Sequence, residues 1–153
     1  MANTYTQIYI HIVFAVKYRQ SLISDKFKDE LYKYITGILK NKNQKLISIN
    51  GMPDHTHLFV GMKPEMAISD LVRDVKSNSS KFINDKRFTK GKFEWQDGFG
   101  AFSYSYSQID NVVKYIQNQE EHHKKKTFKE EYIGLLKKFE IKYDETYLFK
   151  ELI

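Results

Sequence analysis

Residues 52–60 read MPDHTHLFV, and the interpretation of the whole chain starts from this stretch. The apolar residues 58–60 favour a β-strand, in which alternate side chains share one face of the sheet. His55 and His57 are therefore expected to point the same way, about 6–7 Å apart along the backbone. At that spacing both imidazoles can reach one divalent ion, but two surface histidines near the start of a strand give the same pattern. The spacing alone leaves both interpretations open.

The composition predicts one domain that spans residues 1–153. With 41% hydrophobic and 15% aromatic residues, the chain can bury a substantial core. It contains no cysteine, which excludes disulfides, a thiol nucleophile and cysteine-ligated zinc. Any metal must therefore be held by histidine, carboxylate or amide groups.

The apolar segments are too short to predict a membrane protein. The longest of them, Ile8–Val16, is interrupted by His11 and is far shorter than a bilayer span requires. The N-terminal residues lack the basic and apolar regions of a signal peptide. We expect a cytoplasmic protein that has no membrane partner.

The charge balance favours polyanionic partners. Lys and Arg number 25 and Asp and Glu number 19, which gives a formal net charge of +6. The bias is strongest over residues 81–92, where only Asp85 opposes the basic side chains of Lys81, Lys86, Arg87, Lys90 and Lys92. A solvated loop explains this cluster as well as a track for phosphates does.

Hydrophobic periodicity predicts an α+β fold. Alternation favours strands, and apolar residues at intervals of three and four favour helices. The expected elements are a strand at 4–17, a helix from an N-cap at Ser24 to Leu39, a hairpin of strands at 45–50 and 55–62, a helix at 68–82 and a strand at 99–106. This order is the ferredoxin-like βαββαβ pattern, an antiparallel sheet with helices on one face. It places both histidines on an inner strand.

A further helix is expected to follow the fourth strand, with Ser107 as its cap. It runs through Tyr115 and Gln119 toward His122 and His123. Because Tyr115 and Gln119 are four residues apart, they are predicted to lie on one face of this helix. Taken alone, a tyrosine in such a position is more often half-buried than catalytic.

Three other features are expected to be structural. Residues 127–130, TFKE, form a capping box for a further short helix, and the aromatic tail at 141–153 is expected to pack. His11 stands alone in the first strand, where a core histidine is a better explanation than a metal ligand.

Several stretches together resemble the small single-tyrosine HUH transposases of bacterial insertion sequences. These are YIHIVFAVKYR at 9–19, MPDHTHL at 52–58 and YIQNQ at 115–119. The segments GFGAFS at 98–103 and QEEHH at 119–123 are also typical of that family. The resemblance covers nearly the whole chain in the same order, and the ordered set is far more specific than any single motif.

The resemblance implies roles for four residues. His55 and His57 match the paired metal ligands, Gln119 the third ligand, and Tyr115 the nucleophile. In the implied reaction the tyrosine attacks a phosphate of single-stranded DNA, with Mg²⁺ or Mn²⁺ bound, and leaves a 5′-phosphotyrosine and a free 3′-hydroxyl. One departure is Thr56, since the residue between the histidines is usually bulky and apolar.

The resemblance also implies partners. Such proteins act as homodimers on DNA hairpins, and in some members the tyrosine helix of one subunit completes the metal site of the other. Basic side chains are expected to hold the DNA backbone, and the residues we select for this role are Arg73, Lys76, Arg87, Lys90 and Lys92.

Three alternatives remain open at this stage. A domesticated relative that cuts chromosomal palindromic repeats shares every catalytic residue. A hydrolase that uses His55, His57 and either His122 or His123 needs no covalent DNA intermediate. A non-catalytic nucleic-acid-binding module uses Tyr115 for packing alone.

Overall fold

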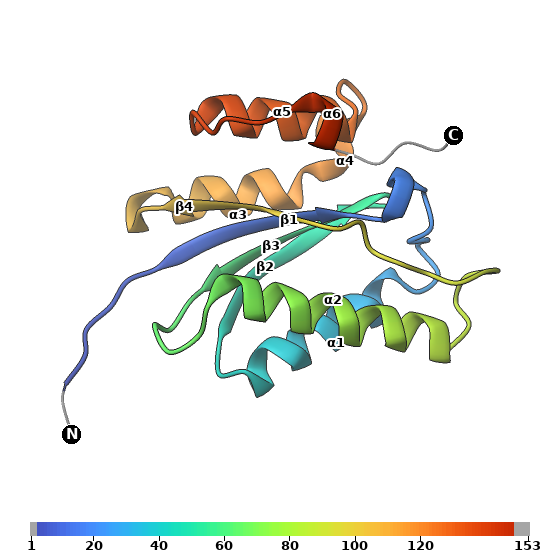
Figure 1. Ribbon diagram of the computed structural model, residues 1–153. Helices are drawn as coiled ribbons and strands as arrows, with labels where there is room; N and C mark the ends of the chain where they lie inside the picture. The colour runs from blue at the N-terminus through green and yellow to red at the C-terminus, as the bar shows by residue number, and fades with distance from the viewer. Residues whose placement is uncertain (1–2, 149–153) are drawn as a thin grey trace.

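Four strands form one antiparallel sheet in the order β2-β3-β1-β4 (Figure 1). The strands are β1 (Tyr9–Ala15), β2 (Lys45–Met52), β3 (His55–Gly61) and β4 (Gly100–Tyr104). β3 lies inside the sheet, paired with β1 on one side and β2 on the other. The computed structural model describes residues 3–148, apart from the side chains of residues 146 and 147.

Helices cover both faces of this sheet (Figure 1). On one face lie α1 (Lys28–Asn41) and α2 (Ile68–Asp85), the two helices of the predicted βαββαβ unit. On the other lie α3 (Ile109–Gln117), α4 (Gln119–His123) and α5 (Phe128–Lys138), and α6 (Glu145–Leu148) follows. The predicted ferredoxin-like fold is confirmed, and the C-terminal helices add a third layer.

The alternation in β1 divides the core into two layers. Ile10, Ile12 and Phe14 pack against α1 and α2 in the larger cluster. Val13 and Ala15 point the other way and contact α5. Because both faces are covered, every residue of β1 after Tyr9 is buried. The strand therefore reads as a continuous apolar run interrupted by His11.

The first strand is shorter than predicted, and its neighbouring helix begins later. Residues 4–7 are exposed and lie outside the sheet, because β3 ends at Gly61 and offers them no partner. Ser24 is not the N-cap of α1. Its carbonyl instead accepts the backbone N–H groups of Phe27 and Lys28 in a turn, and Phe27 occupies the cap position.

The helix that carries Tyr115 is not continuous, which corrects a second prediction. It breaks at Asn118, whose backbone angles are φ −95° and ψ 25°. The side-chain amide of Asn50 on β2 donates to the carbonyls of Ile116 (3.0 Å) and Gln117 (3.3 Å). These carbonyls lie at the helix end and lack an intrahelical partner, so Asn50 caps α3 and allows the chain to turn.

The N-terminal cap of this helix also differs from the prediction. Ser107 is not the cap: Gln108 occupies the N-cap position of α3, and Ser105 caps the short 3-10 turn Tyr106–Gln108 that precedes it by exchanging hydrogen bonds with Gln108. A second 3-10 turn, Lys17–Arg19, follows β1. The predicted capping box of α5 is confirmed, because Thr127 and Glu130 bond reciprocally.

The C-terminal tail packs in part. Tyr143 and Leu148 contact the cluster between β1 and α5, whereas Ile141 is exposed. The remaining part of the predicted tail, 149–153, lies outside the described residues. Within 3–148, none of the helices is both long and apolar enough to cross a membrane.

Candidate metal and tyrosine site

β3 carries both histidines on the face that the C-terminal helices cover. His55 and His57 are fully buried, and their ring centroids lie 5.0 Å apart. Thr56 between them points to the opposite face, where it pairs with Phe14 of β1. The unusual threonine therefore lies away from the site, and its hydroxyl has no hydrogen-bond partner among the described residues.

Each histidine is held through its Nδ1 atom. His55 Nδ1 lies 2.7 Å from Asp54 Oδ1, and His57 Nδ1 lies 2.7 Å from His11 Nε2. Both Nε2 atoms consequently face a common centre between β3, α4 and α5. The turn before β3 and the neighbouring strand β1 thus orient the two imidazoles.

The break at Asn118 places Gln119 at the start of α4, where it is fully buried. Gln119 Oε1 lies 3.0 Å from His55 Nε2 and 3.1 Å from His123 Nε2. Tyr115, on the last turn of α3, has its ring edge toward His57, with 6.0 Å between centroids. The four residues singled out in the sequence therefore lie together.

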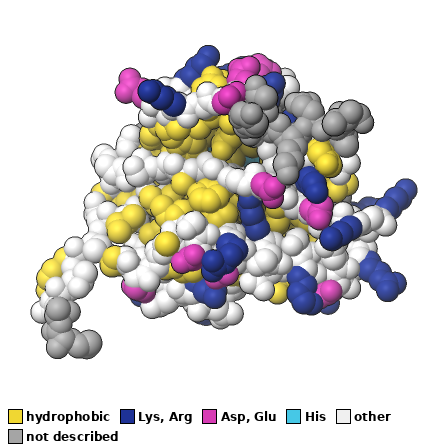
Figure 2. All heavy atoms as spheres, in the orientation of Figure 1, with side chains coloured by type: hydrophobic (Ala, Val, Ile, Leu, Met, Phe, Trp, Pro, Cys, Tyr) yellow, Lys and Arg dark blue, Asp and Glu magenta, His cyan; other side chains and the backbone are white. Residues whose placement is uncertain are grey.

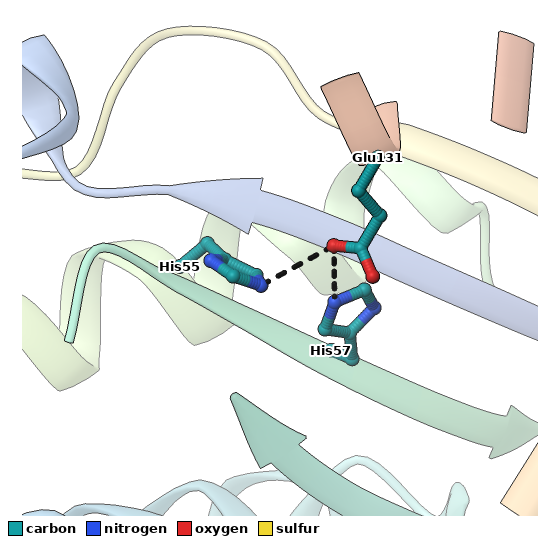
Figure 3. Close-up of side chains that lie close together, drawn as sticks. All are labelled: His55, His57 and Glu131. Atoms are coloured by element: carbon teal, nitrogen blue, oxygen red, sulfur yellow. Dashed lines mark hydrogen bonds and ion pairs between the residues drawn. The ribbon is translucent and has the colours of Figure 1, made fainter. Parts of the chain in front are cut away.

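Glu131 of α5 lies beside His55 and His57 and completes this cluster (Figure 3). The sequence analysis did not identify this residue. Its Oε1 atom lies 3.2 Å from His57 Nε2 and 3.4 Å from His55 Nε2. Its Oε2 atom accepts hydrogen bonds from the Tyr115 hydroxyl and from Gln119 Nε2, the latter at 3.2 Å. The ligand atoms of His55, His57 and Glu131 all lie within 4.8 Å of one another, as a shared metal ion requires.

A weak sequence signal for Glu131 exists. It lies three residues after Phe128 and four before Leu135, so it shares the buried face of α5 with both. A carboxylate on the apolar face of an amphipathic helix requires a partner. The signal gives no indication of which partner, because the histidines are more than seventy residues away in the sequence.

Burial and hydrogen bonding shift the pKa values of His55 and His57 in opposite directions. Burial lowers the pKa of His55, but its bonds to Asp54 and Glu131 outweigh burial and raise this pKa to about 9. For His57 burial prevails over the bond to Glu131, and its pKa falls below the ordinary value. Without a metal, the site therefore holds one imidazolium and one neutral imidazole beside a carboxylate.

The pKa values of Glu131 and Tyr115 are shifted as well. Burial favours a neutral Glu131, but hydrogen bonds from His123, His55 and His57 outweigh burial and hold its pKa well below the usual range. Burial and the adjacent Glu131 charge raise the pKa of Tyr115 above its ordinary value. The Tyr115 phenol is therefore neutral in this arrangement and donates its proton to a carboxylate.

The two histidines after Gln119 take different positions. His123 enters the cluster, with Nε2 3.2 Å from Glu131 Oε1. His122 lies beside Tyr115, with 4.6 Å between the ring centroids. A hydrolase site built on His123 thus has support from proximity, whereas one built on His122 has none.

The five selected basic residues divide into two groups. Arg73, Lys76 and Lys92 line one groove of about 570 Å³ between α2 and residues 92–98. Arg87 and Lys90 are exposed but do not line it. Figure 2 shows Lys and Arg side chains mixed with acidic ones over this side of the molecule.

All three basic residues of the groove have partners, and for Lys92 the partner is Glu94 at 3.4 Å. Lys76 donates to the backbone carbonyls of Gln96 (2.8 Å) and Gly98, and burial lowers its pKa to about 8. Arg73 pairs with Asp70 at 3.1 Å. Lys76 therefore holds the segment 96–98 against α2 rather than projecting freely.

Comparison with known proteins supplies the biological context. The family described as "Transposase IS200 like" matches residues 4–119. ISDra2 transposase TnpA of Deinococcus radiodurans is 26% identical over 118 residues, which span 74% of this chain and 84% of that protein. The transposase for insertion sequence element IS200 of Salmonella typhimurium is 24% identical over 123 residues, 80% of either chain.

Solved structures share the fold. A transposase from Deinococcus radiodurans R1 has a TM-score of 0.63 at 24% identity and covers 78% of this chain and 95% of its own. A REP-associated tyrosine transposase bound to a REP hairpin has a TM-score of 0.61 at 15% identity, covering 80% of this chain and 73% of its own. The family match includes His55, His57, Tyr115 and Gln119, whereas Glu131 lies beyond it.

Proposed function

Because the chain belongs to the family of IS200-like transposases, we propose that it cuts and rejoins single-stranded DNA at hairpin-marked ends, with Tyr115 as the nucleophile. The observation that carries this proposal is the contact of Tyr115 with the same carboxylate that joins His55 and His57. The cluster therefore links a nucleophile to a set of metal ligands within one buried site.

The donor atoms suit a divalent cation. Two imidazole nitrogens, an amide oxygen from Gln119 and a carboxylate oxygen from Glu131 converge, with neighbouring atoms 3.0–3.4 Å apart. Adjacent ligands around an ion with bonds of about 2.1 Å are separated by about 3 Å. We propose that His55, His57, Gln119 and Glu131 hold Mg²⁺ or Mn²⁺, since oxygen ligands suit these metals. A bound ion of this kind polarises the scissile phosphate and stabilises the leaving 3′ oxygen.

Tyr115 performs the covalent step in this proposal. Its oxygen attacks the phosphorus in line, the bond from phosphorus to the 3′ oxygen breaks, and a 5′-phosphotyrosine forms. Glu131 Oε2 is placed to accept the phenolic proton, and the leaving 3′ oxygen takes a proton from solvent to become the free 3′-hydroxyl. The 3′-hydroxyl of another DNA end reverses the step and rejoins the strands, so no hydrolytic water is consumed.

The charge of Glu131 sets a condition on this step. Burial and Glu131 raise the pKa of Tyr115, which makes the phenol a poor nucleophile in the metal-free site. A cation held by His55, His57, Gln119 and Glu131 would offset the charge of Glu131 and remove its contribution to the pKa of Tyr115, while Glu131 Oε2 would remain within reach of the phenolic proton.

We propose that DNA approaches along the groove beside α2. The groove shares Gln96, Asp97 and Gly98 with a smaller cavity of about 210 Å³, which extends to Phe128 and Tyr132 of α5. Phe128 stacks on His55, with 4.3 Å between centroids. Arg73 and Lys92 would hold phosphates inside the groove, and the exposed Arg87 and Lys90 would hold phosphates outside it. The exposed Phe99 is available for stacking on a base.

The tyrosine acts in cis in this proposal, because the Tyr115 hydroxyl donates to Glu131 of its own chain, which also contacts His55 and His57. The homodimer that the family resemblance implies then brings two DNA ends together and is not needed to complete a site.

The test is a covalent adduct on a denaturing gel. Single-stranded oligonucleotides from the palindromic flanks of the gene are incubated with the protein and Mn²⁺, with the same sequences as duplex for comparison. We expect a metal-dependent adduct on single strands only, and its loss in His57→Ala. Cleavage without an adduct would support the hydrolase instead, and binding without cleavage would support a binding module.

A further inference from the structure

His11 is a buried histidine that is not among the proposed metal ligands and takes no part in the proposed reaction. It is 0% exposed, and its Nε2 atom lies 2.7 Å from His57 Nδ1, on the side of that ring away from Glu131. The two rings are stacked, with 5.0 Å between centroids and 16° between planes. On the basis of the role we proposed for His57, we infer that His11 is a positioning residue. It holds the His57 ring in the orientation in which His57 Nε2 can bind the metal.

Strand register explains how the contact arises. Val13 of β1 lies opposite His57, and His11 lies two residues further along on the same face. Diagonal neighbours of an antiparallel pair are within reach when the side chains are long. The sheet therefore presents one histidine on β1 to the outer nitrogen of a histidine on β3, independently of any loop.

The hydrogen-bond chain dictates which nitrogen carries each proton. In the metal-free site Glu131 is an acceptor only, so His57 must donate from Nε2, and its Nδ1 accepts the Nε2 proton of His11. When His57 Nε2 holds a metal, its proton must lie on Nδ1 and is donated to His11 Nε2. His11 then carries its own proton on Nδ1. The two rings hold two protons in both states, so only their positions change.

The remaining nitrogen of His11 fits this role. His11 Nδ1 is buried and has no hydrogen-bond partner within residues 3–148. No neighbour therefore fixes the tautomer of His11, and the ring is free to serve as donor or acceptor toward His57. Asp54, the corresponding partner of His55, cannot change between donor and acceptor in this way, because a carboxylate only accepts hydrogen bonds.

The test compares two substitutions by Mn²⁺ calorimetry. His11→Gln keeps a polar amide near the position of Nε2, whereas His11→Phe keeps the ring volume and removes the partner. We expect Mn²⁺ affinity within about threefold of the parent for His11→Gln and a loss of about 10- to 100-fold for His11→Phe. Phe102→Leu is the matched control, since Phe102 is buried against the His11 ring without a hydrogen bond. It should lower thermal stability and leave Mn²⁺ affinity unchanged.

A second readout follows the protons directly. Nitrogen-15 NMR of the parent protein should place the His57 proton on Nε2 without metal and on Nδ1 with Mg²⁺. Equal Mn²⁺ affinity in the parent and His11→Phe, or one His57 tautomer in both states, would overturn the inference and leave the proposed metal site intact. Failure of the parent protein to bind Mn²⁺ would overturn the metal site itself.

Discussion

Glu131 contacts five side chains through two oxygen atoms: His55, His57 and His123 through Oε1, and Tyr115 and Gln119 through Oε2. Its negative charge and that of Asp54 balance the imidazolium of His55 that this site holds at neutral pH. Glu131→Gln should weaken Mn²⁺ binding at least about tenfold, because the number of charged ligands tunes affinity. Calorimetry measures this loss. Glu130→Gln, an exposed neighbour in the capping box, is the control and should bind Mn²⁺ as the parent does.

The raised pKa of His55 predicts how stability depends on pH. In the metal-free protein His55 keeps its proton up to about pH 9, whereas an unfolded histidine releases it near 6.5. The free energy of unfolding should therefore fall as pH rises from 6.5 to 9, by about 3 kcal/mol in all. Urea unfolding with a chelator present measures this, and His55→Asn should remove the dependence. Stability that rises across this window would contradict the assignment.

At the scale of the elements, the break between α3 and α4 determines where Gln119 lies relative to Tyr115. Asn50→Ala removes the amide that caps the carbonyls of Ile116 and Gln117. We expect a loss of about 1–2 kcal/mol in unfolding free energy and weaker Mn²⁺ binding, because Gln119 loses its fixed position. Asn41→Ala, at the exposed end of α1, should change neither quantity. An unchanged Mn²⁺ affinity in Asn50→Ala would show that the break does not position the ligand.

The elements also explain which parts of the site the sequence could predict. His55 and His57 share a face because of spacing within one strand, and Tyr115 and Gln119 are close neighbours in the chain. The break at Asn118 could not be predicted, because it depends on an asparagine 66 residues before Ile116. Glu131 has a local signal only for burial, and His11 reaches His57 only through the register of β1 and β3.

At the scale of the whole molecule, the DNA path that we propose follows the basic side chains. Lys92 is exposed in the groove beside α2, and its only described ion pair, with Glu94, is at 3.4 Å on the surface. Lys92→Ala should weaken single-stranded DNA binding and reduce the slope of log affinity against log salt by about 0.7. Fluorescence anisotropy over a salt series measures that slope. Lys28→Ala, on α1, is the control and should leave it unchanged.

The fold as a whole followed from the pattern of the sequence, since alternation and helical spacing specify the sheet and its two covering helices. The complete site could not be predicted from that pattern. The reason is that α5 lies beyond the family match, and its Glu131 contacts His57, which lies far earlier in the chain. The molecule thus combines a family core with a C-terminal helix that adds Glu131 to the cluster of His55, His57, Tyr115 and Gln119.

The central claim is that Tyr115 forms a covalent bond to DNA, and mass spectrometry of the adduct tests it most directly. Trypsin releases residues 115–124, YIQNQEEHHK, in which Tyr115 is the only tyrosine. After nuclease digestion of an adduct formed with Mn²⁺, fragmentation should place the nucleotide on Tyr115. Tyr115→Phe should yield no adduct, whereas Tyr104→Phe should behave as the parent. A nucleotide on His122, His123 or any residue outside this peptide would contradict the account.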